Sequence, residues 1–389
     1  MKFALLGVDN ELLALARGIF PHKEHQLVAI FEPGEHAYAL HALAPSARTS
    51  EEWESLLLTG AVDVVLVGRA ATSADARADQ LKKLAQAKVP LVVLQPGCEY
   101  IDGYEVEMIR RDVDGVIIPY YPGIFQPEVY ELALLTGGAA NAKVPGIGEF
   151  EQLVIERRMT VRTRELVLAQ LARDVDLVRR LLGNITQVSA SGKVDDAHPP
   201  ITLGVQLTSE HGVLSRWSVG PADTNPGATV TLVGAEGKIQ LELPEQGDGR
   251  WIINGESKPL AARQDEARLL IDLVQQAITT GNTKAPTWQD ACRAAEIPGT
   301  VPRCLARGKT IELYNEEHTE DGAFKGTMAV GGCLLILFGL LAVVTVAVVE
   351  GLQLPLHDYF LWRIWPVYLL TPIVAFLLLQ VVGVLARRK

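Results

Sequence analysis

The sequence predicts an α/β domain built on a doubly wound parallel sheet, an α+β domain with an open, mostly antiparallel sheet, and two transmembrane helices. Three observations lead to this prediction. Short runs of Val, Ile and Leu alternate with amphipathic stretches over residues 1–120, a pattern typical of parallel sheets covered by helices on both faces. Residues 121–318 instead contain a long helical pattern followed by alternating strands. Two long uncharged apolar runs then occupy residues 327–349 and 364–386.

The first domain contains apolar runs that are short enough to be strands and are bounded by turn residues. The stretches between them place apolar residues three and four positions apart, as amphipathic helices do. In such a sheet the carboxyl ends of the strands border the ligand crevice, so the residues that follow each strand form the candidate site. The strands are expected at 2–8, 26–31, 62–67, 91–94 and 115–118, and the helices at 11–19, 51–58, 74–87 and 104–111.

The second domain opens with a helix expected over residues 163–182, which ends before Gly183. A glycine after the last apolar position is a common helix stop. Alternating strands separated by turn residues follow, which predicts a sheet with one solvent-facing side. Two further helices are expected at 263–279 and 288–307. The strands are expected at 186–191, 201–208, 213–219, 228–232, 238–243 and 250–253.

Each C-terminal run exceeds the length of about 18 apolar residues that a helix needs to cross a bilayer. Aromatic residues gather at the start of the second run, as they do at membrane interfaces. Basic residues lie before the first run and after the second, whereas the loop between them carries Glu350, Asp358 and a single basic residue, Arg363. The positive-inside rule therefore predicts an inner-membrane hairpin, with the soluble module and the C-terminal tail in the cytoplasm. The alternative is a pair of buried core helices in a large soluble fold.

The composition narrows the classes of partner and chemistry. The 389-residue chain has a net charge of −10 with acidic and basic residues interspersed, so it lacks the basic stripe of a nucleic-acid-binding protein. Its four cysteines are far apart with no CxxC pair, which argues against a disulfide framework and a metal site and favours a reducing compartment. Neither apolar run contains Asp, Glu, His, Lys or Arg, so the hairpin is expected to anchor the protein rather than to conduct ions.

Motifs around the second domain carry a family resemblance. Residues 288–297 read WQDACRAAEI, and residues 308–313 read GKTIEL. The stretches FQP at 125–127, GIGE at 146–149 and DVDLVRRLLG at 174–183 precede them in that order. Together they resemble the glucose–fructose oxidoreductase, inositol dehydrogenase and MocA (Gfo/Idh/MocA) family over roughly residues 1–316. The resemblance implies a nicotinamide cofactor, a sugar or polyol substrate, and self-association through the second-domain sheet.

A Rossmann-like dinucleotide site needs glycines in the pattern G-x-G-x-x-G, because the turn is tight and the backbone approaches the pyrophosphate. The first strand ends in GVDNEL, so Gly7 is kept while Asp9 and Leu12 stand at the other two glycine positions. Glu32 ends the second strand, where an acid can bond the ribose hydroxyls. In one interpretation NAD or NADP binds here; in the other, cofactor binding is lost and Asp9 caps the first helix. The residues expected to contact a cofactor are Gly7, Asp9, Glu32 and Pro96.

The resemblance also implies where catalytic groups would lie. The family's Glu-Lys-Pro motif is replaced by Leu94-Gln95-Pro96, and glutamine neither carries a charge nor exchanges a proton near neutral pH. The family's helix Asp and His correspond to Ala169 and Arg173. No catalytic residue is therefore assigned, and the sequence predicts a membrane-anchored, catalytically degenerate oxidoreductase-fold protein that binds a partner or a small ligand. The alternative is an active NAD(P)-dependent oxidoreductase with a rearranged site for a sugar- or polyol-like substrate.

Three further positions are singled out near these motifs. Asp176 matches an acidic position in the family's helix motif and is expected to be structural. Tyr120 and Tyr121 follow the fifth strand, so they either line a ligand pocket or pack against the second domain.

Overall fold

The computed structural model describes the chain from Met1 to residue 313 and a long C-terminal helix, with short gaps. It divides into two compact units, Met1–Tyr314 and Asn315–Lys389. The side chains of residues 100, 263–264, 320–334 and 350 are also outside the description. The residues that are not described are 22–23, 59, 61, 71–72, 96, 137–141, 195–199, 223–224, 246–248, 260–262, 282–284, 314–319, 353–370 and 372–389.

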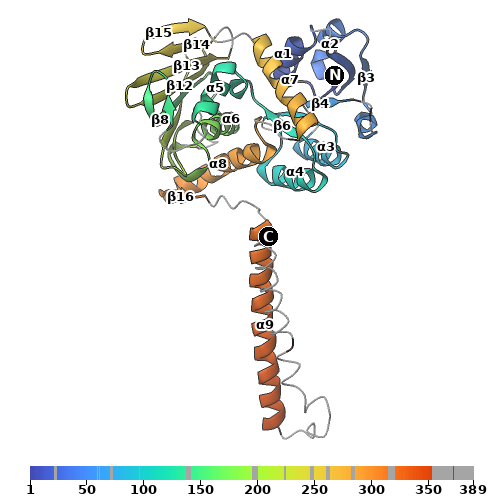
Figure 1. Cartoon of the computed structure of the whole chain (residues 1–389), viewed down its shortest axis with the longest axis vertical. Coiled ribbons are helices and arrows are strands. Elements are labelled where there is room, and N and C mark those ends of the chain that lie inside the picture. Colours follow the sequence, from blue (N-terminus) through green and yellow to red (C-terminus); the bar gives the residue numbers. More distant parts are fainter. Residues whose placement is uncertain are drawn as a thin grey trace. The chain divides into compact units, whose positions relative to one another are not determined.

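Within the described residues, the first sheet has six parallel strands in the order β3-β2-β1-β4-β5-β6 (Figure 1). Helices cover both faces, as predicted. Phe3 and Leu5 of the central strand pack in one apolar cluster with α1, whereas Leu6 packs on the other face with α3. The strands are β1 Lys2–Leu6, β2 Gln26–Phe31, β3 Arg48–Ser50, β4 Val64–Val67, β5 Leu91–Leu94 and β6 Ile117–Tyr120, and the helices are α1 Asn10–Ile19, α2 Ala37–Leu43, α3 Ala74–Gln86 and α4 Tyr100–Val113.

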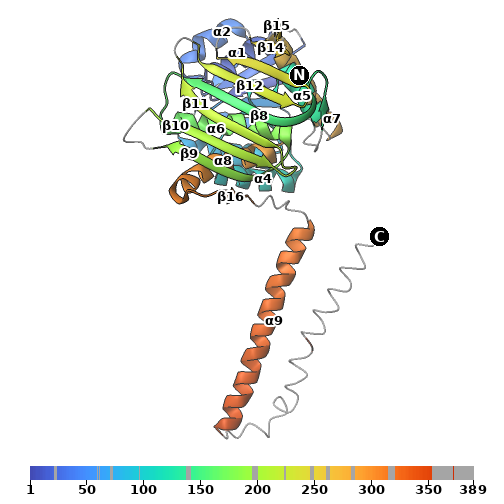
Figure 2. The same ribbon diagram turned by 90° about the vertical axis from the view of Figure 1, so that its left-hand side faces the viewer.

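The second sheet, counted over the described residues, has ten strands, and Figure 2 shows its broad face. Its path is β15-β14-β13-β12-β8-β11-β10-β9-β16, with β7 paired to β8. The β8–β11 pair is parallel and the other pairs are antiparallel, so the predicted mostly antiparallel sheet is present. The strands are β7 Lys143–Val144, β8 Gly148–Met159, β9 Ile185–Lys193, β10 Thr202–Ser209, β11 Leu214–Pro221, β12 Gly227–Gly234, β13 Gly237–Pro244, β14 Arg250–Ile253, β15 Glu256–Pro259 and β16 Ile311–Glu312.

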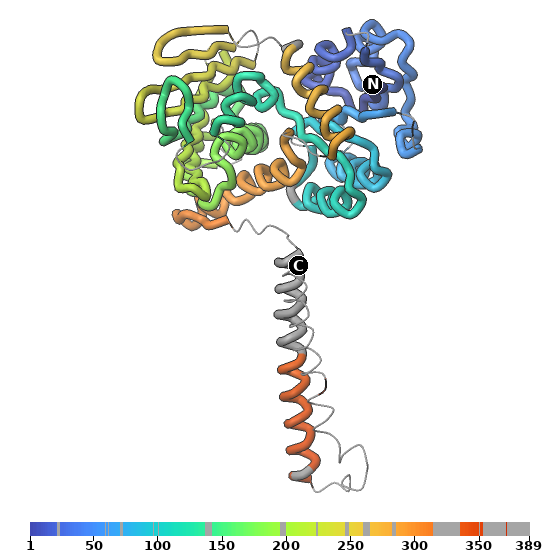
Figure 3. Tube along the Cα trace, in the orientation of Figure 1, coloured from blue at the N-terminus to red at the C-terminus, as the bar shows by residue number. Residues whose placement is uncertain are grey.

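Helices cover one face of this sheet and connect it to the first domain. α5 (Pro127–Thr136) follows β6 and packs on α6 (Arg164–Leu182). α8 (Trp288–Arg307) packs on α6 and β9 and also reaches α4 of the first domain. The chain trace in Figure 3 shows α7 (Arg263–Thr280) returning to lie beside α1. The two domains therefore share one interior, and residues from both can form one site.

The two sheets differ in sequence pattern because they differ in burial. All four residues of β4 (VVLV) are buried, since helices cover both faces of the first sheet. β10 instead alternates buried and exposed positions, with Leu203, Val205 and Leu207 facing the core. This period of two is the mark of a strand with one solvated face.

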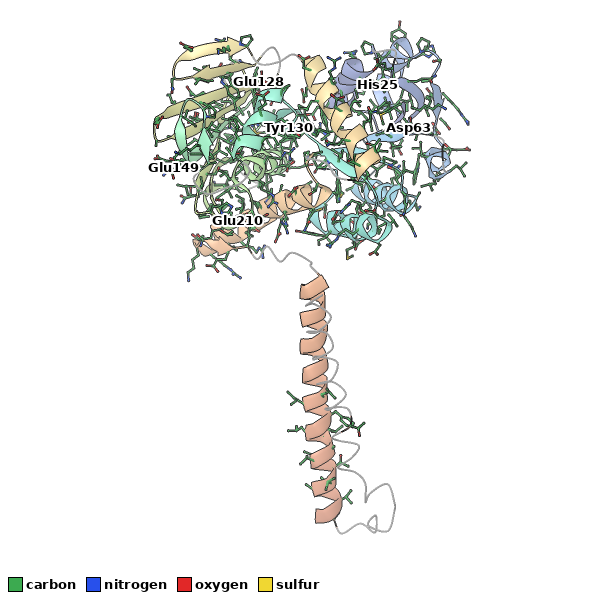
Figure 4. All side chains as sticks on the ribbon, viewed as in Figure 1. His25, Asp63, Glu128, Tyr130, Glu149 and Glu210 are labelled. Atoms are coloured by element: carbon green, nitrogen blue, oxygen red, sulfur yellow. The ribbon has the colours of Figure 1, made fainter. Side chains whose placement is uncertain are left out.

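Residues that lie just before two of the strands form additional hydrogen bonds through their side chains. The Lys2 amide donates to Asp63, which precedes β4, over 2.6 Å. Asn184, which precedes β9, donates to the Glu210 carboxylate over 3.2 Å. Figure 4 labels Asp63 in the first domain and Glu210 in the second.

One predicted helix takes a different form. The helix expected at 51–58 is a 3₁₀ helix over Trp53–Leu57. Its buried residues are Trp53 and Leu56, three positions apart. This spacing matches the three residues per turn of a 3₁₀ helix, and so short a segment has no second buried turn to hold an α-helix.

The second unit is described as α9, Glu320–Gly351. Among the residues that the structure describes, no helix combines the length and apolarity required to cross a bilayer. The first predicted span, 327–349, lies within α9, and the second, 364–386, lies outside the described residues except for Thr371. The described residues thus give no support to the two predicted transmembrane helices.

Candidate functional site

The candidate site lies at the carboxyl ends of β1, β2, β4 and β5, and its floor is Gly7. Gly7 has a φ of +68°, a conformation that glycine adopts without steric cost. A Cβ atom at this position would lie 1.9 Å from Nη2 of Arg77 and 2.0 Å from the carbonyl oxygen of Ala70. The turn therefore requires glycine, and the guanidinium of Arg77 fills the space directly over it.

Arg77, which comes from α3, is bonded to the acid at the end of β2. Its Nη2 lies 3.3 Å from Oε2 of Glu32, and Gln80 Nε2 donates to Oε1 of the same carboxylate over 2.7 Å. Arg77 is only 2 % exposed and also donates to the carbonyl of Ala70. Burial lowers the pKa of Arg77, and the charge of Glu32 opposes that effect. The carboxylate expected to bond ribose hydroxyls is thus already bonded within the protein.

Asp9 caps α1 and binds a second arginine. Its Oδ1 accepts from the Leu12 amide over 2.8 Å, and its Oδ2 accepts from Nε of Arg69 over 3.0 Å. Burial alone would raise the pKa of Asp9, but the Leu12 hydrogen bond and the charge of Arg69 outweigh it, so the pKa is lowered. Asp9 is therefore ionised at neutral pH and engaged on both oxygens.

Glu11 joins this network to the second domain. Its Oε2 lies 3.1 Å from Nη2 of Arg69 and also accepts from Nη2 of Arg173 on α6. The guanidinium of Arg173 stacks 4.6 Å from the ring centre of Tyr121. Among the described side chains at these strand ends, the network joins three carboxylates to three guanidinium groups, namely Asp9, Glu11 and Glu32 with Arg69, Arg77 and Arg173.

The positions expected to carry catalytic groups converge on the same region. Gln95 follows β5 and is 8 % exposed, and its backbone amide donates to the Tyr120 carbonyl over 2.9 Å. Arg173 is 9 % exposed. Pro96 lies outside the described residues. Gln95 and Arg173 line one small pocket together with Asp176.

Tyr120 and Tyr121 bond to the second domain. Tyr120 donates to Glu266 of α7 over 3.1 Å. Tyr121 donates to Asp174 of α6 over 3.3 Å. Both hydroxyl groups donate to residues of the second domain. The structure therefore agrees with the alternative in which the two tyrosines pack against that domain, rather than the one in which they line a ligand pocket.

Asp174 is the centre of a buried polar cluster, which we call the Asp174 cluster. Asp174 is fully buried and accepts from Nε of Arg157 over 3.0 Å and from Nε1 of Trp217 over 2.7 Å. Gln170 also donates to it, over 3.2 Å. Because Arg157 lies on β8 and Trp217 on β11, the cluster fastens α6 to the middle of the second sheet.

Arg69 and Arg77 are site residues that the sequence analysis missed. Gly7, Asp9 and Glu32 do lie at one edge of the sheet, but the side chains that bind them come from the loop after β4 and from α3. One signal was available. Arg77 shares the buried face of α3 with Leu81 and Leu84, and a cation on an apolar stripe needs a buried partner.

Known structures share this fold. A myo-inositol dehydrogenase from Corynebacterium glutamicum is 17% identical with a TM-score of 0.65, covering 81% of this chain and 99% of its own. An oxidoreductase from Agrobacterium radiobacter, in complex with NAD+, L-tartaric acid and magnesium, is 17% identical with a TM-score of 0.62 and covers 80% of this chain and 98% of its own. An aldose-aldose oxidoreductase from Caulobacter crescentus, complexed with glycerol, gives 17% and 0.62 over 80% and 99%.

These similarities confirm the predicted parallel-sheet domain and the mostly antiparallel-sheet domain, a fold that known oxidoreductases share. No protein-family model matches the chain, and no curated protein matches it.

Proposed function

We propose that this chain is a catalytically degenerate oxidoreductase-fold protein that binds a partner or a small ligand without oxidising or reducing it. The observation that carries the proposal is the position of Arg77 over Gly7, bonded to Glu32. A pyrophosphate would need the space that this guanidinium fills. It would also have to separate Arg77 from Glu32, whose side chain is 28 % exposed.

The catalytic positions support the same proposal. Gln95 has no ionisable group, so it cannot exchange a proton with a substrate. Arg173 keeps its proton at physiological pH, and it is bonded to Glu11. Neither side chain can therefore act as a general acid or base.

The alternative function is that of an active NAD(P)-dependent oxidoreductase. Glu32 does lie at the end of β2, and the Agrobacterium structure with the same fold is a complex with NAD+. Cofactor binding would then require Arg77 to leave Glu32 and bond a phosphate.

Thermal unfolding with NADH and NADPH separates the two functions. A ligand at about 100 times its Kd stabilises the native state by about 2.7 kcal/mol, so a functional site shows a clear rise in Tm at millimolar cofactor. We expect no rise for the native chain. The same change in Tm is measured for Arg77→Ala, which removes the side chain over Gly7. Arg48→Ala, which removes an exposed arginine of β3, is the control for that variant. A rise in Tm with the native chain, accompanied by turnover, would establish the alternative.

We also propose that the second unit attaches the protein to the inner membrane, with the Met1–Tyr314 unit in the cytoplasm. The support is the pair of uncharged runs and the placement of basic residues around them. Large aliphatic side chains of α9 are also exposed: Ile336 is 74 % exposed, Leu337 63 %, and Leu340 and Leu341 64 % each. An exposed apolar surface of this kind typically marks an interaction with a membrane or another protein.

Fractionation of cells that express the full chain tests the attachment. We expect the protein in the membrane pellet after washing with high salt and alkali, with release by detergent only, because apolar contacts are not weakened by salt. Release by salt alone would contradict it. Sedimentation of the detergent extract then measures self-association. Its proposed surface, the second-domain sheet, stays a prediction from the family resemblance.

A further inference from the structure

Protein side chains fill the crevice at the strand ends. The guanidinium of Arg77 occupies the space over Gly7. The neighbouring pocket, lined in part by Gln95 and Arg173, has room for about one water molecule. A ligand or a segment of a partner can therefore enter the crevice only after the elements on its two sides have moved apart.

A charged contact joins the two sides of the crevice at α1. Arg173 of α6 donates from Nη2 to Oε2 of Glu11 in the first turn of α1, although the two residues are 162 positions apart. The same carboxylate lies 3.1 Å from Nη2 of Arg69, which also binds Asp9. The side chains of Glu11 and Arg69 are 30 % and 32 % exposed, respectively, so salt can weaken this contact.

The second domain holds Arg173 in the position that the contact needs. Its guanidinium stacks 4.6 Å from the ring centre of Tyr121. The Tyr121 hydroxyl donates to Asp174 over 3.3 Å and accepts from Nη2 of Arg157 over 3.2 Å. Because its neighbours already fix Arg173, little side-chain entropy is lost when it binds Glu11.

Where α8 reaches α4, the contacts between the domains are apolar instead. Trp288 and Cys292 of α8 are buried in one cluster with Val93 and Val106 of the first domain. Trp288 Nε1 also donates to the Gly103 carbonyl over 2.9 Å. Screening of charges by salt does not weaken apolar burial. The domains are thus joined by a lasting contact at α4 and by a releasable contact at α1.

α7 follows the second sheet in the chain, but its contacts place it with the first sheet. It packs on α1, and Glu266 of α7 accepts from the hydroxyl of Tyr120, at the end of β6, over 3.1 Å. We therefore expect α7 to move together with α1, so that these contacts stay in place when α1 separates from α6.

We propose that the Glu11–Arg173 contact is a clamp that holds the crevice closed. When the clamp is released, α1 moves away from α6, and the apolar contact between α8 and α4 stays in place as the pivot of the hinge motion. The inference goes beyond the proposed function, because the clamp controls the entry of any ligand, whether or not that ligand is a nicotinamide cofactor.

Chemical trapping of a thiol behind the clamp measures how often the crevice opens. Ala172→Cys, one position before Arg173 on α6, places the thiol in the wall of the pocket, which is too small to admit N-ethylmaleimide. The full chain in detergent is labelled, and peptide mass spectrometry reports the introduced thiol separately from the four native cysteines. We expect slow labelling while the clamp is intact.

Removing the charge of Glu11 tests the clamp itself. Glu11→Gln, added to Ala172→Cys, should raise the labelling rate about tenfold or more, since a hydrogen bond to a charged group contributes at least that factor to an equilibrium. Glu165→Gln, the same exchange at an exposed position of α6, is the control and should leave the rate unchanged. Fast labelling with the clamp intact, no rise with Glu11→Gln, or an equal rise with Glu165→Gln would overturn the inference.

Two further measurements separate the clamp from a local effect of Glu11 on α1. Arg173→Met removes the other partner and should raise the rate to a similar level, and its combination with Glu11→Gln should add little, because both act on one contact. Sodium chloride at about 1 M, where the Debye length is about 3 Å, should speed labelling with the clamp intact but not with Glu11→Gln. Additive effects of the two substitutions, or equal effects of salt with and without the clamp, would contradict it. If Arg173→Met does not fold, Glu11→Gln and the salt series still decide. No cofactor takes part in the labelling, so its failure is distinct from a failure of the proposed function.

Discussion

Replacing Asp174 with alanine is expected to lower the free energy of unfolding by about 3–5 kcal/mol, because it leaves a buried charge without its partner. Arg157 is 6 % exposed and its guanidinium is bonded to Asp174 and Tyr121. Trp217 and Gln170 would lose the same acceptor. The cost is large compared with the total stability of about 5–15 kcal/mol of a typical domain.

Urea unfolding followed by tryptophan fluorescence measures the loss, and Trp217, which donates to Asp174, is one of the six tryptophans that contribute to the signal. Asp79→Ala is the control, because Asp79 forms a solvent-exposed pair with Lys83 on α3, and such pairs contribute little to stability. The double variant Asp174→Leu with Arg157→Met is expected to cost less than Asp174→Ala alone, since neither charge is then left buried and unpaired. Equal losses for Asp79→Ala and Asp174→Ala would contradict this account of the Asp174 cluster.

Asp176→Asn is expected to stabilise the protein at pH 8 by up to about 3 kcal/mol. Burial raises the pKa of Asp176 from its ordinary value of 3.8 to about 6; the positive charges of Arg180 and Arg179 oppose this effect and Asp290 adds to it. A raised pKa means that the folded state binds the proton more tightly than the unfolded state does. Each pKa unit corresponds to about 1.4 kcal/mol, so the ionised carboxylate costs about 3 kcal/mol, a cost that asparagine does not carry.

The sign of this effect fixes its pH window. Between pH 3.8 and about 6 the folded state holds more protons at Asp176 than the unfolded state, so the contribution of this group to stability falls as the pH rises. Above pH 6 the cost is constant, and below pH 4 it is absent. The stability difference between Asp176→Asn and the native chain, measured by urea unfolding from pH 4 to pH 8, should therefore grow through this window and then level off. For Asp112→Asn, at an exposed position on α4, the difference in stability from the native chain should not change with pH. A difference for Asp176→Asn that does not change with pH would contradict the raised pKa of Asp176.

The sequence predicted the fold well where burial is uniform or strictly alternating. β4 is apolar throughout because both faces are covered, and β10 alternates because only one face is. β8 was not among the predicted strands, because Arg157 stands at a buried position of its pattern. Arg157 is tolerated inside the sheet because Asp174 neutralises it, and no local pattern indicates a partner on another element. β3 and β16 are too short to show a period.

The sequence located the strand ends at which the candidate site lies, but it did not identify the side chains that bond to the residues there. Gly7, Asp9 and Glu32 could be located because strand ends are readable from the sequence. Their partners could not, since Arg77 is 45 positions from Glu32 and the pairing depends on how α3 packs. Asp176 was expected to be structural, yet its carboxylate faces a pocket and has no partner among the described groups. Burial of that kind follows from the packing of α6 on α8, which a single helix pattern does not determine.

The place of β8 in its sheet has a consequence for biosynthesis. β8 lies between β11 and β12, so Gln152 waits for Leu214, about sixty residues later, before its ladder can form. Until that stretch leaves the ribosome, β8 has only its short pairing with β7 at its first residues, and pairings this distant form slowly. We infer that, until the later strands are synthesised, β8 is the part of the second sheet most open to pairing with the wrong strand.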